Sequence, residues 1–129
     1  MENLIILGTG PAGLTSALYS ARASLNPLCV EGEQPGGQLT ITSDVENYPG
    51  FAEPVMGPEL MVAFRKQAER FGTRFVRGNV RRVDLSKRPF TIEFADEKSV
   101  QTQTLIIATG ASAKWIGIES EKRLMGKGV

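Results

Sequence analysis

The sequence predicts a three-layer α/β fold with a parallel sheet and a small antiparallel β-layer. Residues 4–7, 28–30 and 105–108 are short, continuous apolar runs, which are typical of strands buried on both faces of a parallel sheet. Residues 58–71 carry a clear amphipathic helical pattern. Residues 80–102 contain alternating apolar positions, which indicate antiparallel strands.

A glycine-rich loop follows the first apolar run directly. It has the GxGxxG spacing and consists of Gly8, Thr9, Gly10, Pro11, Ala12 and Gly13. Such glycines allow a tight turn, close backbone approach to a pyrophosphate, and close packing of helix on strand. Glu31 lies eighteen residues after Gly13, near the place where the motif expects an acid for ribose hydroxyls. We therefore expect a dinucleotide site here, the alternative being a purely structural turn.

The next residues complete a βαβ unit. From Pro11 to about residue 24, small and apolar residues recur at helical spacing, and Asn26-Pro27 ends the pattern. Residues 28–30 then form the second buried strand, which ends at Glu31. Cys29 lies inside this strand, so we interpret it as a small core residue and not as a redox or nucleophilic group.

Residues 32–51 form a long irregular segment, and such segments tend to be functional. A double glycine permits positive φ and close approach to a flat ligand, and the polar side chains offer amides and a hydroxyl to a heteroaromatic ring. The alternative is a flexible connector, but Tyr48 and Phe51, which we expect to be buried, argue against it. The candidate ligand residues of the segment are Gly36, Gly37, Gln38, Thr42 and Asn47.

The second half of the chain supplies the remaining elements. After the helix at 58–71 we expect a short strand at 73–77, then an antiparallel layer from residues 80–85, 90–94 and 99–102. A separate buried strand at 105–108 ends in Thr109-Gly110, where open α/β sheets bind ligands. The tail from Ser112 to Val129 has no core pattern of its own.

Composition excludes several classes of function. With 129 residues the chain has room for one domain, and its net charge of +1 gives no reason to expect nucleic acid or a membrane as partner. We interpret the basic pair Arg81-Arg82 as solvated surface. One cysteine and no histidine leave no zinc site and no Ser/His/Asp triad, and we name no catalytic and no metal-binding residue. No secretory signal is recognised, so a cytoplasmic location is expected.

Five stretches together resemble the N-terminal part of the flavoprotein disulfide reductases, specifically the bacterial-type low-molecular-weight thioredoxin reductases. They occur in family order and span nearly the whole chain. The first and last are shared by many flavoproteins with two dinucleotide sites, whereas the middle three are more specific. In sequence they read ILGTGPAG at 6–13, GGQL at 36–39, VENYPGF at 45–51, GPELM at 57–61 and LIIATGA at 105–111.

The resemblance implies a Rossmann-like FAD-binding domain over residues 1–112 and a connector over 113–129. It implies pyrophosphate at the glycine loop, ribose at Glu31, flavin near residues 36–38 and Asn47, adenine against the Val80 backbone, and closure by Thr109-Gly110. It also supplies the choice of FAD over NAD. The full set of expected cofactor residues is Gly8, Thr9, Gly10, Pro11, Ala12, Gly13, Glu31, Gly32, Gly36, Gly37, Gln38, Leu39, Thr42, Asn47, Val80, Ala108, Thr109 and Gly110.

The activity implied for the parent family is transfer of electrons from NADPH, through FAD and a redox dithiol, to thioredoxin, by a homodimer. This sequence has no CxxC pair and no second GxGxxG for NADPH, so we expect an inactive fragment of such an enzyme. Alternatives are the FAD domain of a thioredoxin-reductase-like ferredoxin reductase, a non-catalytic dinucleotide-binding module, and an NAD dehydrogenase domain.

Overall fold

A computed structural model describes residues 1–125 and 127, and it contains one mixed sheet of six strands in the order β5-β2-β1-β8-β7-β6. Parallel pairing joins β1 to β2 and β8, and β2 to β5, whereas β7 pairs antiparallel with β6 and β8. The α/β fold with an antiparallel β-layer is thereby confirmed. The strands are β1 (Glu2–Leu7), β2 (Leu28–Glu31), β5 (Arg74–Arg77), β6 (Val80–Asp84), β7 (Phe90–Phe94) and β8 (Ser99–Ile107).

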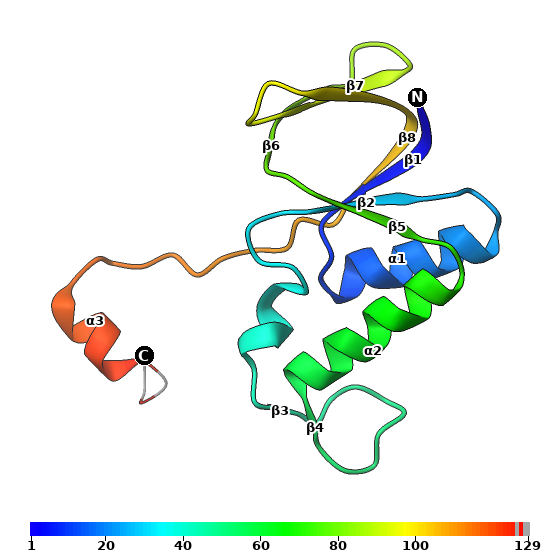
Figure 1. The fold of residues 1–129 in the computed structure, drawn as a ribbon. Helices are drawn as coiled ribbons and strands as arrows, with labels where there is room; N and C mark the ends of the chain where they lie inside the picture. Colours follow the sequence, from blue (N-terminus) through cyan, green and yellow to red (C-terminus); the bar gives the residue numbers. More distant parts are fainter. Residues whose placement is uncertain (126, 128–129) are drawn as a thin grey trace.

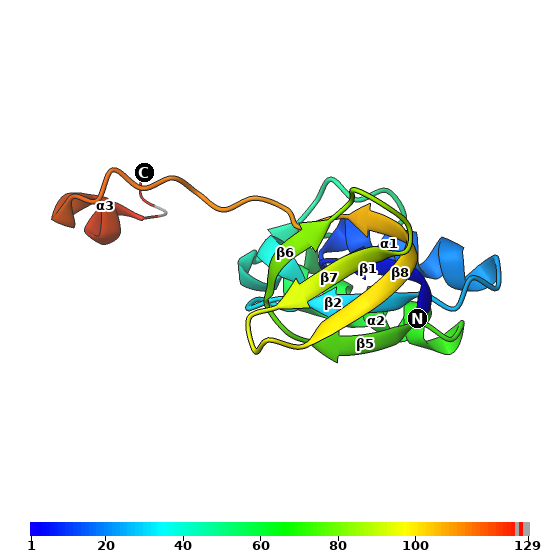
Figure 2. The same cartoon turned by 90° about the horizontal axis from the view of Figure 1, so that it is seen from above.

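The sheet separates two cores. Helices α1 (Pro11–Arg22) and α2 (Gly57–Arg70) cover one face, while β6, β7 and the first half of β8 curl over the other (Figures 1 and 2). Strand β1 alternates between them: Ile6 packs in the helix-side core with Cys29, and Ile5 packs under the antiparallel strands with Ile92. All four side chains are completely buried. The apolar run therefore reflects a strand covered on both faces.

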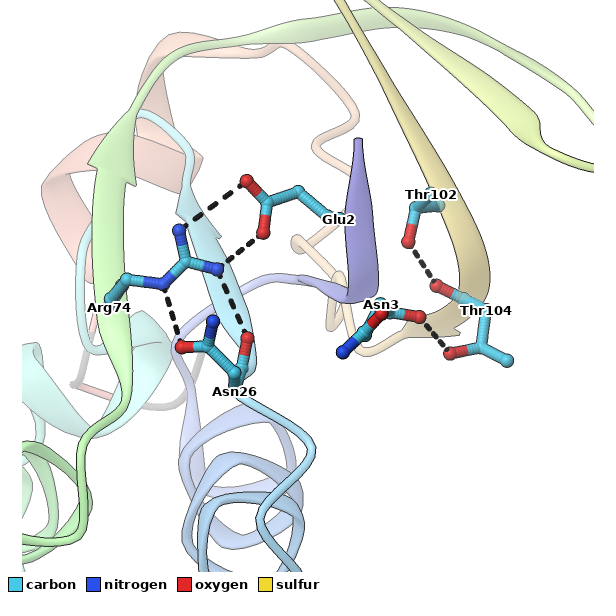
Figure 3. A network of polar contacts seen from close by, with 6 residues as sticks. All are labelled: Glu2, Asn3, Asn26, Arg74, Thr102 and Thr104. Atoms are coloured by element: carbon cyan, nitrogen blue, oxygen red, sulfur yellow. Dashed lines mark hydrogen bonds and ion pairs between the residues drawn. The ribbon is translucent and has the colours of Figure 1, made fainter.

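Strand β8 is one continuous element, which corrects the two separate strands expected at 99–102 and 105–108. Its first half pairs with β7 and its second half with β1, so it links the two layers. The intervening polar residues fit because their hydroxyls are satisfied: Thr102 donates to the carbonyl of Thr104 at 2.7 Å, and Thr104 donates to that of Asn3 at 2.7 Å (Figure 3). β-Branched threonine is also a good strand former.

A β-bulge between Val80 and Arg82 shapes β6. Val80 and Val83 are three residues apart, so a regular strand would turn them to opposite faces. The extra residue lets both join the core under β7. Leu85, the last residue of the strand expected at 80–85, follows the observed strand and is 52% exposed.

The segment after β2 is less irregular than expected. It contains the 3-10 helix η1 (Gly37–Ile41) and a small antiparallel pair, β3 (Asp44–Val45) with β4 (Val55–Met56). Gly36 and Gly37 have φ of 87° and 66°, as the double glycine predicted. Short elements of two strand residues each are below the length at which periodicity can be recognised.

The expected burial of Tyr48 and Phe51 is wrong, since these side chains are 40% and 47% exposed. They instead pack on each other, with ring centroids 6.0 Å apart, and Tyr48 packs edge-on against Phe64 of α2 at 5.3 Å. Aromatic pairs of this geometry hold a loop to a helix surface without a full cover of other residues.

The predicted connector at 113–129 contains a short helix, α3 (Glu119–Leu124), that the sequence did not indicate. The buried Glu121 carboxylate accepts the backbone N–H groups of Ile116 at 2.9 Å and Gly117 at 2.8 Å, which folds the chain before the helix onto it. Figures 1 and 2 show the stretch after β8 running away from the sheet. Gly126, Gly128 and Val129 lie outside the described residues.

Candidate dinucleotide site

A cleft of about 1090 Å³ lies along the carboxyl ends of β1, β2 and β8. Strand β2 lies on one side of β1 and β8 on the other, and in α/β sheets ligands bind where successive connections leave in opposite directions. The cleft is lined by Leu7, Gly8, Thr9, Gly10, Pro11, Ala12, Val30, Gly32, Glu33, Gln34, Gly37, Gln38, Leu39, Gly78, Asn79, Val80, Arg81, Arg82, Val83, Ile107, Ala108, Thr109, Gly110, Ala111 and Ser112.

The glycines of the first loop have distinct roles in the geometry. A Cβ on Gly8 would come closer than 3.0 Å to the carbonyl of Ala108, and a Cβ on Gly13 would come closer than 3.0 Å to the carbonyl of Gly8. Gly8 also has a φ of 105°. A Cβ on Gly10, by contrast, would meet no atom within 4 Å, because this residue faces the cleft. Two glycines therefore allow backbone packing, and the third leaves the cleft open.

The N-terminus of α1 faces the same cleft. Gly10 is its N-cap, no side chain caps the first turn, and Pro11 occupies the first helical position, where its missing N–H costs nothing. The first-turn amides of Ala12 and Gly13 are therefore free of a side-chain acceptor. Such a helix end carries partial positive charge and N–H donors, which suit an anionic group such as a phosphate.

Two polar contacts connect the double-glycine segment to its neighbours, one to the glycine loop and one to the turn after β8. The buried Thr9 hydroxyl accepts the backbone N–H of Gly36 at 3.2 Å. At the opposite rim the Gln38 side chain donates to the carbonyl of Ala111. Gly37 also approaches Gly10, with 3.2 Å between the Cα of Gly10 and a Cβ placed on Gly37. The double-glycine segment thus forms a second wall of the cleft.

The structure brings most of the expected cofactor residues to one place, because thirteen of the eighteen line the cleft. Gly13 lies behind the loop, packed on Gly8, and Gly36 packs near Thr40 and Met61. Thr42 donates to the carbonyl of Gln38 at 3.1 Å. Asn47 lines a second, apolar pocket of about 380 Å³ with Tyr48 and Phe64, and this pocket adjoins the cleft because both are lined by Pro11, Ala12 and Leu39.

Glu31 lies at the end of β2 and is only 5% exposed; it is not among the residues that line the cleft, although its neighbours Val30 and Gly32 are. Its carboxylate pairs with Arg65 of α2, a partner that sequence reasoning did not identify. Arg65 also donates to Glu69 at 2.8 Å. Burial alone lowers the pKa of Arg65, but its bonds to Glu31 and Glu69 raise it above the ordinary value, so the guanidinium stays charged.

Several cleft residues were missed from the sequence. Arg81 and Arg82, interpreted as solvated surface, line the cleft beside the bulge in β6, and Arg81 pairs with Glu93 at 3.5 Å. Asn79 also lines it and donates to Glu33 at 3.0 Å. No motif marks these positions, since the curl of the antiparallel layer brings them to the edge.

Cys29 is completely buried in the helix-side core. Burial, assisted by the negative charge of Glu31, raises the pKa of the Cys29 thiol to about 12. A thiol with this pKa has almost no thiolate at neutral pH and is a poor nucleophile. This supports the interpretation of Cys29 as a core residue.

Among residues 1–125 and 127, no group of three or more His, Cys, Asp or Glu side chains is arranged to hold a metal ion. Within the same described part of the chain, every helix is too short or too polar to cross a bilayer.

The chain matches one family model and several curated proteins over nearly its whole length. A family model described as pyridine nucleotide-disulphide oxidoreductase matches residues 2–129. The thioredoxin reductase of Rickettsia bellii is 56% identical over 126 residues, which are 98% of this chain and 41% of that protein. The thioredoxin reductase of Vibrio cholerae is 52% identical over 128 residues, 99% of this chain and 40% of that protein. Glucosaminate ammonia-lyase of Pseudomonas fluorescens is 48% identical over 128 residues, with the same two coverages.

Solved structures agree with the sequence matches. Thioredoxin reductase from Lactococcus lactis superposes with a TM-score of 0.86 at 35% identity, covering 98% of this chain and 41% of that one. The enzyme from Streptococcus pyogenes gives a TM-score of 0.87 at 36% identity, covering 96% and 40%. The chain therefore spans about 40% of the length of its relatives. The family model matches nearly all residues of this chain, and the fold and the glycine loop agree with that match. The chain therefore belongs to the pyridine nucleotide-disulphide oxidoreductase family.

Proposed function

We propose that this chain is the FAD-binding portion of a thioredoxin reductase. The observation that carries the proposal is the cleft in which the glycine loop, the double-glycine segment and the turn after β8 meet. The free first-turn amides of α1 would hold the pyrophosphate, and the open space at Gly10 would let it approach. Residues 1–112 form the FAD-binding domain in this proposal, and residues 113–129 form a connector.

The residues present fit the cofactor. Gly37 and Gln38 flank the part of the cleft assigned to the flavin, and Val80 lies beside the part assigned to the adenine. When bound, FAD supplies two-electron redox chemistry that no side chain in this sequence provides. The chain itself contributes phosphate donors, a polar wall and a buried carboxylate at Glu31, while Thr109 and Gly110 close the far edge.

Binding is tested by titrating the purified chain with FAD and with NAD, following flavin fluorescence and thermal unfolding. FAD at about 100 times its Kd should add about 2.7 kcal/mol to the free energy of unfolding. Stabilisation by NAD alone would contradict the proposal. A cooperative melt that neither ligand changes would favour a module that binds no dinucleotide.

The parent activity we propose is NADPH-dependent reduction of thioredoxin in the cytoplasm by a homodimer. The thioredoxin reductases among the relatives support it. A second candidate is the reaction named for the ammonia-lyase relative, because that protein shares 48% identity over the same region. A longer protein that contains this chain together with a CxxC pair and an NADPH site should oxidise NADPH in the presence of thioredoxin. Release of ammonia from glucosaminate without thioredoxin reduction would overturn the assignment of this activity. The proposed homodimer is tested separately, by measuring the molar mass of the same protein by light scattering.

A further inference from the structure

The Glu31 carboxylate is held from the helix side of the sheet. Its Oε1 accepts a hydrogen bond from Nη1 of Arg65, thirty-four residues away in α2. Glu31 is the last residue of β2, and its neighbour Gly32 lines the cleft. The pair therefore connects α2 to the end of the strand where a ribose is expected.

Arg65 is itself fixed by three groups. Its Nε donates to Glu69 at 2.8 Å, one turn along α2, and its guanidinium carbon lies 4.1 Å from the ring centroid of Phe75 on β5. A planar guanidinium with these partners keeps one orientation. Its Nη1 is consequently directed at Glu31.

The second carboxylate oxygen of Glu31 remains available. Oε2 accepts no hydrogen bond from residues 1–125 or 127, although the residue as a whole is 5% exposed. In the same described part of the chain, no completely buried side-chain oxygen or nitrogen lacks a partner. Oε2 must therefore retain some exposure. An ionised carboxylate with one oxygen occupied and one open is a strong acceptor for a hydroxyl.

We propose that Arg65 is a positioning residue that holds Glu31 so that Oε2 accepts the ribose hydroxyls of the adenosine half of the cofactor. The inference rests on the proposed FAD site. Without Arg65 the buried carboxylate would lack its compensating charge, and it would rotate toward water. This rotation removes the acceptor from the ribose.

A purely structural role for the pair is the alternative, and ligand discrimination separates the two. The ligands are FAD and its 2′-deoxyadenosine analogue, which lacks one ribose hydroxyl, and Kd is measured by flavin fluorescence with the full 129-residue chain. The wild type should bind FAD at least about tenfold more tightly than the analogue. In R65Q this ratio should fall toward one, and R65K should recover part of it. K66Q, an exposed neighbour, should keep the wild-type ratio.

The outcomes are distinguishable. An R65Q variant that folds, binds FAD and keeps the wild-type ratio overturns the positioning role and leaves the FAD site intact. A wild-type chain that binds FAD but does not discriminate against the analogue overturns the ribose contact. Absence of FAD binding by the wild type overturns the proposed function itself.

If the R65Q variant does not fold, a second comparison replaces it. E31Q removes the charge that Arg65 compensates, so E31Q and the E31Q/R65Q double variant can be compared directly. If Arg65 acts through Glu31, both variants have the same ratio close to one. A further loss of discrimination in the double variant would contradict the inference.

Discussion

The Cα of Gly13 faces the carbonyl of Gly8 so closely that a Cβ on Gly13 would lie under 3.0 Å from both the carbonyl oxygen and its carbon. This contact joins the first turn of α1 to the loop that leaves β1. Gly10, three residues earlier, has open space at the same position and a φ of −68° that any residue adopts. The three glycines of one motif are thus separable by experiment.

Gly13→Ala should destabilise the fold, and Gly10→Ala should not. The first change forces backbone groups apart and should lower the free energy of unfolding by about 1–3 kcal/mol. The second places a methyl group in the cleft, so thermal unfolding should stay within about 0.5 kcal/mol of wild type while FAD binding weakens. Calorimetry and fluorescence titration measure the two effects. Equal melting temperatures for both variants would contradict this division of roles.

The glycine loop was predictable from sequence because its constraints are local. Gly8 and Gly13 must lack a side chain for reasons set by residues next to them and by the strand beside them. The positive φ at Gly36 and Gly37 was predictable on the same ground. The apolar runs of β1 and β2 likewise indicated strands covered on both faces.

The remaining features depend on packing that no local pattern encodes. Arg65 contacts Glu31 only because α2 packs on the sheet with the Arg65 side of the helix turned toward the end of β2. Arg82 reaches the cleft because a bulge and the curl of the antiparallel layer bring β6 to that edge. The continuity of β8 through Thr102 was hidden because a polar residue normally ends a buried strand, and only the structure shows its hydroxyl satisfied.

Cys29 should resist alkylation in the folded chain. It is completely buried, and its thiol has a pKa of about 12, so the reactive thiolate is scarce at pH 8. Iodoacetamide, followed by mass spectrometry, should leave Cys29 unmodified for hours, and the same chain in urea should react fully. Rapid labelling without denaturant would mean that the β2 core opens readily.

The ion pair between Glu2 and Arg74 should make stability depend on pH. Arg74 on β5 donates to the Glu2 carboxylate on β1 and also to the side chain and carbonyl of Asn26 at 3.1 Å each (Figure 3). The hydrogen bond from Arg74 lowers the pKa of Glu2 below its ordinary value of 4.5. A lowered pKa in the folded state stabilises the protein above about pH 4.5, and this contribution disappears as the pH falls through the folded-state pKa.

Glu2→Gln should therefore cost up to about 1 kcal/mol at pH 7, limited by solvent screening because Arg74 is 43% exposed. The difference from wild type should shrink steadily below pH 4.5. Urea unfolding at pH 7, 5 and 3 measures it. The exposed Glu53, changed to Gln, serves as the control and should show no such trend. A cost for Glu2→Gln that stays constant with pH would exclude the ion pair as its source.

Thr102→Val tests how the two layers are joined. Thr102 is completely buried at the point where β8 passes from β7 to β1, and its hydroxyl donates to the Thr104 carbonyl at 2.7 Å. Valine has nearly the same shape, so the packing is kept while one buried hydrogen bond is lost, which should cost about 1 kcal/mol. Thr104→Val is the matched control, because its hydroxyl also donates at 2.7 Å, to Asn3, but lies exposed, where water replaces the lost donor. The free energy of unfolding measured in urea should therefore be lower for Thr102→Val than for Thr104→Val. The reverse order would show that the buried hydroxyl is not what allows this polar residue inside the strand.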